Sequence, residues 1–138
     1  MVANQSPRGE TRMITVLNFS HPLSKPAREH LNAPGVAGEG GAVIIRVPVQ
    51  VDLEAPIIPQ VDEIVRDAFQ RMSAAGITPN AVNVDCIVPP GLSVVAVPLC
   101  NRFPTANLIS LRRDTSRVAG NVYVISEIIR ARHVHPRK

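Results

Sequence analysis

Short apolar runs alternate with helix-like segments along most of this chain, and that alternation restricts the folds it can adopt. Mostly apolar runs predict five strands, at residues 13–18, 42–51, 81–88, 107–112 and 121–130. Periodic or capped segments between them predict three helices, at residues 24–31, 59–75 and 93–102. The order β, α, β, α, β, α, β, β predicts a small α/β, Rossmann-like sheet that is mostly parallel, and the short last connection favours an antiparallel C-terminal hairpin.

Serine and proline positions add local detail to this pattern. Ser24 is placed to cap the first helix, and Pro26 fits its first turn. Pro48 lies inside the second strand and predicts that this strand bends or lies at a sheet edge, because proline has no amide hydrogen to donate. Pro98 interrupts residues 93–102, so we expect a short and irregular helix there.

The length and the charge distribution indicate one folded domain with disordered terminal segments. We expect a folded domain over residues 13–130, a disordered extension at residues 1–12 and a basic disordered tail at residues 131–138. Residues 13–129 carry nine basic and ten acidic side chains, whereas residues 130–138 carry four basic side chains and no acid, so most of the net charge of +4 lies at the C-terminus. A duplex-binding surface needs many basic side chains that contact phosphates on one folded face, and residues 13–129 are nearly neutral. The sequence therefore predicts no binding to duplex DNA.

The aromatic and cysteine content excludes several further classes. Three Phe, one Tyr and no Trp argue against a surface that stacks single-stranded nucleic acid. Cys86 and Cys100 lack the neighbouring ligands of a zinc site, so we expect buried free thiols in a reducing cytoplasm and no metal. The longest apolar run, residues 92–100, is too short to cross a membrane, and residues 1–12 lack the apolar core of a secretion signal. The sequence therefore predicts a cytoplasmic protein with no membrane partner.

Polar residues follow the first predicted strand directly. Asn18, Ser20 and His21 either tie off a turn, with the following proline holding His21 extended, or contact a ligand. The carboxyl ends of parallel strands meet at one edge of a sheet, which is where open α/β sheets bind their ligands. We therefore expect residues 18–21 to lie beside residues 89–92.

A site built from these two loops would offer backbone amides, hydroxyl groups and cations, which suit a ligand with several phosphates. Gly91 permits a backbone conformation in which the amides that follow it point at an anion. The sequence has neither the glycine-rich dinucleotide fingerprint nor the P-loop motif, and we expect no cofactor. The candidate ligand-binding residues are Asn18, Phe19, Ser20, His21, Pro90, Gly91, Leu92, Arg102, Thr105 and Arg112.

Five motifs occur in a fixed order across about residues 13–130. They are Leu-Asn-Phe-Ser-His-Pro-Leu at 17–23, Val-Pro-Val-Gln-Val-Asp at 47–52 followed by Pro-Gln-Val at 59–61, Pro-Pro-Gly-Leu at 89–92, Phe-Pro-Thr at 103–105, and Val-Tyr-Val-Ile-Ser-Glu-Ile-Ile at 122–129. In these motifs the chain resembles the small ancillary proteins of type III CRISPR loci, which are related to CARF domains and associated with cyclic tetra-adenylate. Five spaced matches are far more specific than any one of them.

The resemblance implies a CARF-like homodimer that holds cyclic tetra-adenylate across its two-fold axis. Asn18, Ser20 and His21 match the opening motif of the family, and Gly91 matches its second loop. Whether dimers assemble further through an edge strand, such as residues 42–51, is left open.

Three activities are compatible with this resemblance and with the residues. Sequestration of the second messenger by a sponge that damps the antiviral response is favoured, because neither loop has a lysine, a metal cluster or a paired acid and base. The alternative is a metal-independent ring nuclease that uses the ribose 2′-hydroxyl, with His21 and Ser20 as candidate catalytic residues. The third is a protein-interaction module without a small ligand.

Overall fold

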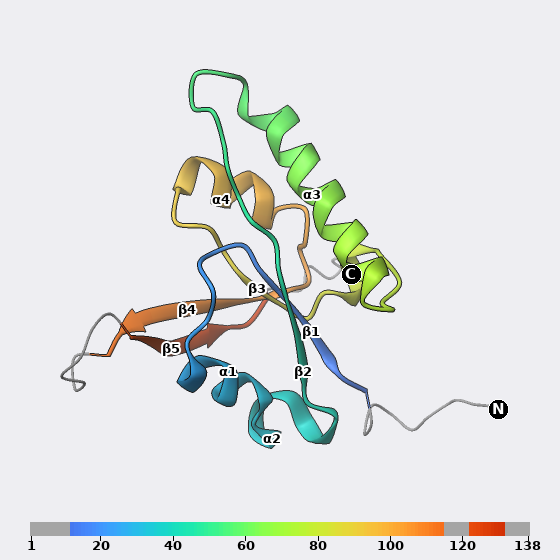
Figure 1. Ribbon diagram of the computed structural model, residues 1–138, viewed down its shortest axis with the longest axis vertical. Coiled ribbons are helices and arrows are strands. Elements are labelled where there is room, and N and C mark those ends of the chain that lie inside the picture. The colour runs from blue at the N-terminus through green and yellow to red at the C-terminus, as the bar shows by residue number, and fades with distance from the viewer. Residues whose placement is uncertain (1–11, 115–121, 132–138) are drawn as a thin grey trace, which may run out of the picture.

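The computed structural model describes residues 12–114 and 122–131, which form a five-stranded sheet between two layers of helices (Figure 1). The strands lie in the order β2-β1-β3-β4-β5; the first four are parallel, and β4 and β5 are antiparallel. This arrangement confirms the predicted α/β, Rossmann-like sheet and its C-terminal hairpin. The strands are β1 (Ile14–Asn18), β2 (Ala42–Arg46), β3 (Cys86–Val88), β4 (Asn107–Arg113) and β5 (Tyr123–Ile129).

Helices cover both faces of the sheet, as a parallel sheet requires. The helices α3 (Ile57–Ala74) and α4 (Ser93–Cys100) lie on one face, and α1 (Lys25–Asn32) and the single turn α2 (Pro34–Ala37) lie on the other (Figure 1). Neighbouring residues of a strand point to opposite faces, so Leu17 joins the apolar cluster under α3 and α4, while Val16 joins the cluster under α1.

Local chemistry explains where the elements differ from the predicted ranges. The third predicted strand keeps only its last residues as β3, and its first part is the 3-10 turn η3 (Ala81–Asn83), where the Asn80 side chain accepts from the Asn83 amide at 3.0 Å. A second 3-10 turn, η2 (Gly38–Gly40), precedes β2. The longest helix begins two residues before Pro59, because first-turn amides have no partner inside a helix and proline is tolerated there. The expected irregular helix is α4, with Pro98 inside it.

The structure tests the predicted position of the second strand, but it describes few residues of the two terminal segments that we predicted to be disordered. β2 is an edge strand, as predicted, but it ends at Arg46, so Pro48 lies after the strand and not inside it as we expected. Most of the predicted disordered extension and basic tail lies outside the described residues. Arg12, which we assigned to the extension, is described and pairs with Asp85 at 2.7 Å. Across residues 12–114 and 122–131, no helix combines the length and the apolar character needed to cross a membrane.

Ser24 fixes the start of α1 and ties it to β5. Its hydroxyl oxygen accepts from the Ala27 amide at 3.2 Å, and the hydroxyl group donates to the Tyr123 carbonyl at 2.6 Å. We expect Ser24→Ala to lower the free energy of unfolding by about 1–2 kcal/mol, because a helix cap and a connection between elements are lost together. Urea denaturation measures this loss. Ser126→Ala, at an exposed position of β5, is the control, and an equal effect of the two substitutions would contradict the assignment.

Candidate functional site

The connections that leave β1 and β3 run toward opposite ends of the sheet, and a crevice lies between them at the carboxyl ends of these two strands. From β1 the chain passes through α1 on one face to β2, and from β2 it passes through α3 on the opposite face to β3, which lies on the other side of β1 (Figure 1). Loops that follow two such strands run away from each other over opposite faces. In open α/β sheets this topological switch point is the usual place for a ligand.

The turn after β1 is held by the side chain of Asn18, which is only 1% exposed. Its Oδ1 accepts from the Ser20 amide at 2.9 Å, and its Nδ2 donates to the His21 carbonyl at 2.9 Å. The interpretation that this side chain ties off a turn is therefore confirmed, and its assignment as a direct ligand contact is corrected: burial leaves no free surface for one. Phe19 is also buried, and its amide donates to the Val88 carbonyl at 2.9 Å.

The two loops converge as the sequence predicted. Residues 19–21 and 90–92, together with Arg46 and Val49, line a cleft of about 150 Å³, which we call the switch-point cleft. His21 and Gly91 are exposed there. Gly91 does not have the special backbone conformation that we expected, because its φ is not positive and a Cβ at this position would meet nothing within 4 Å.

Arg46 is the cation of the cleft, and the sequence analysis missed it. It is the last residue of β2 and lies opposite Asn18 in the register of the two strands, which brings it to the same edge of the sheet. Its Nε donates to the Ser20 carbonyl at 3.1 Å. In the part of the chain that the structure describes, its terminal nitrogens make no hydrogen bond, so they are available to an anion.

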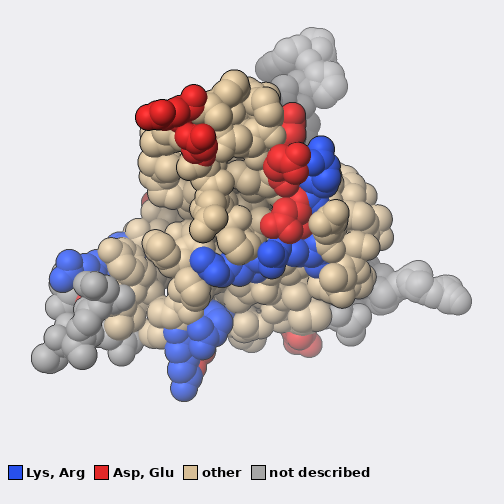
Figure 2. Space-filling view, turned by 45° about the horizontal axis from the view of Figure 1, so that its top comes forward, with Lys and Arg blue, Asp and Glu red and all other residues tan. Residues whose placement is uncertain are grey.

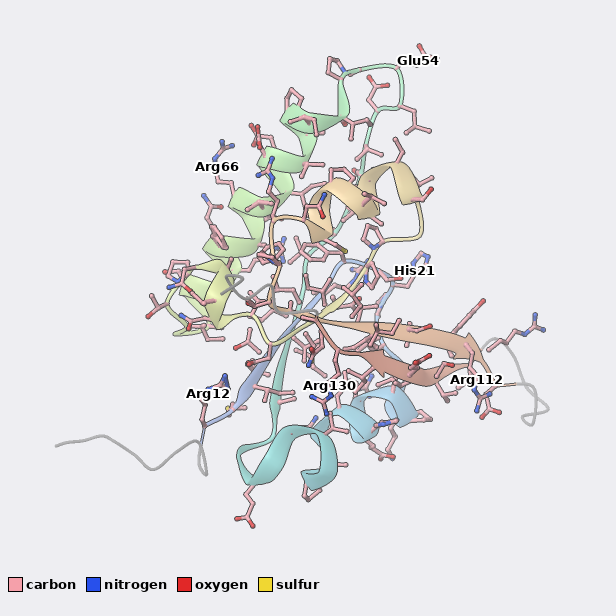
Figure 3. The ribbon with its side chains drawn as sticks, turned by 180° about the vertical axis from the view of Figure 1, so that it is seen from behind. Arg12, His21, Glu54, Arg66, Arg112 and Arg130 are labelled. Carbon is pink, nitrogen blue, oxygen red and sulfur yellow. The ribbon has the colours of Figure 1, made fainter. Side chains whose placement is uncertain are left out.

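Three residues assigned to the site lie elsewhere. Arg102 forms an ion pair with Asp62 on α3 and does not line the cleft. Arg112 lies toward the end of the β4–β5 hairpin, opposite Val124 (Figure 3). Thr105 lines a hollow with Asp85 at the opposite edge of the sheet, because it precedes β4 and the amino ends of parallel strands lie there.

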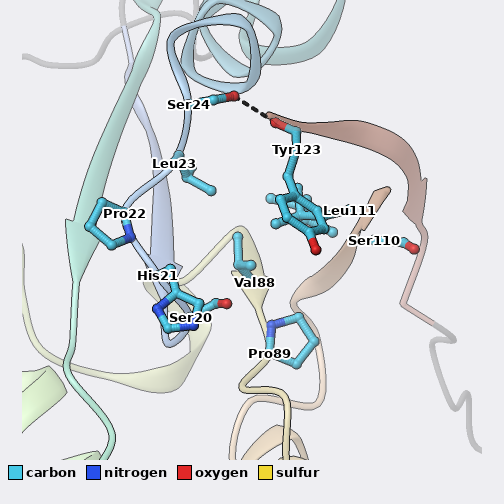
Figure 4. Close-up of a pocket in the computed structure, with 11 residues that line it drawn as sticks. Ser20, His21, Pro22, Leu23, Ser24, Val88, Pro89, Ser110, Leu111 and Tyr123 are labelled. Atoms are coloured by element: carbon cyan, nitrogen blue, oxygen red, sulfur yellow. Dashed lines mark hydrogen bonds between the residues drawn. The ribbon is translucent and has the colours of Figure 1, made fainter. Parts of the chain in front are cut away.

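A second hollow adjoins the cleft and shares Ser20 and His21 with it (Figure 4). We call it the β5 hollow; its volume is about 420 Å³. Most of its wall is apolar, and the remaining wall is serine, histidine and tyrosine side chains. Its lining residues are Ser20, His21, Pro22, Leu23, Ser24, Val88, Pro89, Ile109, Ser110, Leu111 and Tyr123.

Basic side chains gather in a band across one face of the molecule, below several acidic side chains (Figure 2). Ion pairs neutralise part of the positive charge on α3 and near α4: Arg71 pairs with Asp67 at 3.0 Å, and Arg102 pairs with Asp62. Arg46 has no such acidic partner among the described residues. A free anion is therefore attracted to Arg46 more strongly than to the paired arginines.

Burial makes the thiols of Cys86 and Cys100 weaker nucleophiles than a free thiol. Burial, together with the nearby Asp85 carboxylate, raises the pKa of the Cys86 thiol to about 11, and burial raises the pKa of the Cys100 thiol as well. Neither side chain lines the switch-point cleft. Within the described ranges, no group of three or more His, Cys, Asp or Glu side chains is placed to hold a metal ion.

Comparison of the chain with protein-family models, curated proteins and solved structures found no match. The geometry of the cleft and the β5 hollow is therefore the structural basis for a functional proposal.

Proposed function

We propose that this chain binds the cyclic tetra-adenylate second messenger of type III CRISPR signalling and sequesters it as a homodimer in the cytoplasm, as a sponge that damps the response. The observation that carries the proposal is the meeting of Ser20, His21, Arg46 and Gly91 in one cleft at the switch point of the sheet. The identity of the ring comes from the resemblance of the five motifs.

The chemistry of the cleft suits an anion better than a neutral metabolite. Arg46 supplies a positive charge with free donors, and the polar side chains of the half-buried Ser20 and the exposed His21 can reach phosphate or ribose oxygens. A cleft of about 150 Å³ holds only part of a cyclic tetranucleotide. Two copies related by a two-fold axis would each bind half of the ring with the same residues.

Sequestration is favoured over cleavage by the side chains that line the cleft and the β5 hollow. General acid–base cleavage needs a general base that takes a proton from the 2′-hydroxyl and a general acid that protonates the leaving oxygen. Among the described residues that line either space, His21 carries the only imidazole, and no carboxylate or lysine accompanies it. A binding protein needs neither group.

Incubation with labelled cyclic tetra-adenylate tests the proposal. We expect intact ligand in a slowly dissociating complex, one ring for two chains, and a melting temperature that rises with ligand concentration. Linear products that disappear in His21→Ala would establish the ring nuclease instead, and linear products that persist would remove His21 from that mechanism. A protein that neither binds the ring nor shifts its melting temperature would contradict both activities and leave the protein-interaction module.

Replacement of Arg46 is expected to weaken binding strongly. Arg46→Gln keeps a polar side chain but removes the charge, and we expect the dissociation constant to rise about tenfold or more, because charge-assisted hydrogen bonds to phosphate contribute about 1.5–3 kcal/mol each. Equilibrium binding at two salt concentrations measures the effect, and the variant should depend less on salt than the wild type.

Arg66→Gln is the matched control for this substitution. Arg66 pairs with Glu63 at 2.7 Å on the exposed side of α3, so the same change of charge occurs away from the cleft. We expect its affinity to stay close to that of the wild type. Equal losses in the two variants would mean that overall charge, rather than the position of Arg46, attracts the ligand.

A further inference from the structure

The β5 hollow has the composition of a site for a flat, partly polar group. Leu23, Val88, Pro89, Ile109 and Leu111 give it apolar walls. Ser20 and Ser110 also line it; the Ser20 hydroxyl group has no hydrogen-bond partner within the described residues, and the Ser110 hydroxyl group points away from the hollow (Figure 4). Its volume of about 420 Å³ lies in the range of small-molecule sites. Apolar walls with an unpartnered hydroxyl group suit the faces and the polar edge of a nucleobase.

Tyr123 supplies an aromatic ring at the rim of this hollow. The residue is 46% exposed, and in Figure 4 its ring reaches from β5 into the hollow on the side opposite to His21 and Pro22. The hydrogen bond from the Ser24 hydroxyl to the Tyr123 carbonyl holds the backbone at this point. A ring on a fixed backbone can stack on a base with little loss of conformational freedom.

The position of the hollow relates it to the anion-binding cleft. Ser20 and His21 line both spaces, so a ligand whose phosphate lies beside Arg46 could extend its base past these two residues toward Tyr123. A free phosphate or a simple sugar phosphate would fill the cleft and leave the apolar walls exposed to water. A nucleotide would occupy both spaces.

We propose that the β5 hollow is the base subsite of the nucleotide site and that Tyr123 stacks on a purine base. This inference rests on the proposed function and extends it, because it assigns the two chemical halves of the ligand to two adjoining spaces. One stacked ring per chain also agrees with the low aromatic content, which argues against an extended single-stranded nucleic acid.

The sequence provides a specific optical probe for this contact. Tyr123 is the only tyrosine and the chain has no tryptophan, so the intrinsic emission of the protein reports on this ring. We expect cyclic tetra-adenylate to quench this emission with the same midpoint as binding measured by calorimetry. Ribose 5-phosphate, which has no base, should leave the emission unchanged. Free N-acetyl-tyrosinamide at the same ligand concentrations corrects for absorption by adenine.

Variants at this position measure the contribution of stacking. Tyr123→Ala should raise the dissociation constant for cyclic tetra-adenylate about tenfold, whereas Tyr123→Phe, which keeps the ring, should bind within about twofold of the wild type. Tyr123→Leu keeps apolar volume without a ring and should resemble the alanine variant. Ile129→Ala is the matched control, because Ile129 is also 46% exposed and lies at the other end of β5, outside the hollow.

Failure of this inference is distinguishable from failure of the proposed function. If cyclic tetra-adenylate binds by calorimetry but the tyrosine emission and the affinity of Tyr123→Ala and Tyr123→Leu are unchanged, the base lies elsewhere and only this inference is overturned. If the wild-type protein does not bind the ring at all, the proposed function and the base subsite are both overturned.

Discussion

Replacing Phe103 with alanine is expected to lower the free energy of unfolding by about 3–5 kcal/mol, which is a large part of the stability of a small domain. The Phe103 ring is 1% exposed and lies between the two other phenylalanines of the chain. Its centroid is 6.2 Å from that of Phe19 and 6.1 Å from that of Phe69, and the second pair meets edge to face. Alanine would leave a cavity between β1, α3 and the segment that follows α4.

Urea denaturation followed by circular dichroism measures this effect. Phe103→Leu, which fills most of the same space, should cost only about 1–1.5 kcal/mol. Val82→Ala, at a position that is 71% exposed, should be close to neutral. A loss below about 1 kcal/mol in Phe103→Ala would mean that the three rings do not form a single packed unit.

The aromatic cluster also has a functional consequence. Phe19 directly precedes Ser20, so the packing of its ring fixes the position from which the polar turn enters the switch-point cleft. The aliphatic positions of the core were evident in the sequence from their spacing, but the three rings were not. Phe19 follows β1, Phe69 lies on α3 and Phe103 follows α4, so no local pattern in the sequence relates the three rings.

The order and the direction of the strands were predictable because apolar periodicity and connection length are local properties of the chain. The meeting of residues 18–21 and 89–92 followed from the same reasoning, since both follow parallel strands. The prediction for Thr105 was wrong, because this residue precedes a parallel strand and does not follow one. It therefore lies at the other edge of the sheet. The direction of β4 was part of the prediction and should have excluded this residue.

Arg46 could not be identified from its immediate neighbours, because an exposed arginine at the end of an apolar run is a common feature. Its position in the cleft depends on the register between β1 and β2, which pairs it with Asn18. Register depends on contacts between segments that lie far apart in the sequence. The useful rule is that the last residue of every parallel strand beside a switch point is a candidate, including residues on the edge strand.

Replacement of Asn18 is expected to reduce both stability and ligand binding. Asn18→Ala leaves the Ser20 amide and the His21 carbonyl without their partner, and we expect the free energy of unfolding to fall by about 1–3 kcal/mol. The turn then loses the geometry that places Ser20 and His21 in the cleft, so the dissociation constant for cyclic tetra-adenylate should rise about tenfold or more in protein that is still folded. Urea denaturation and calorimetry on the same samples measure the two effects.

Two further variants separate a positioning role from a direct contact. Asn18→Asp keeps the oxygen that accepts from the Ser20 amide but cannot donate to the His21 carbonyl, and it buries a negative charge near the anion site. We therefore expect it to bind at least as weakly as Asn18→Ala. Asn101→Ala, at an exposed position after α4, is the control and should be neutral in both measurements. If Asn18→Ala lost binding with unchanged stability, the side chain would contact the ligand directly, and its role in tying the turn would be contradicted.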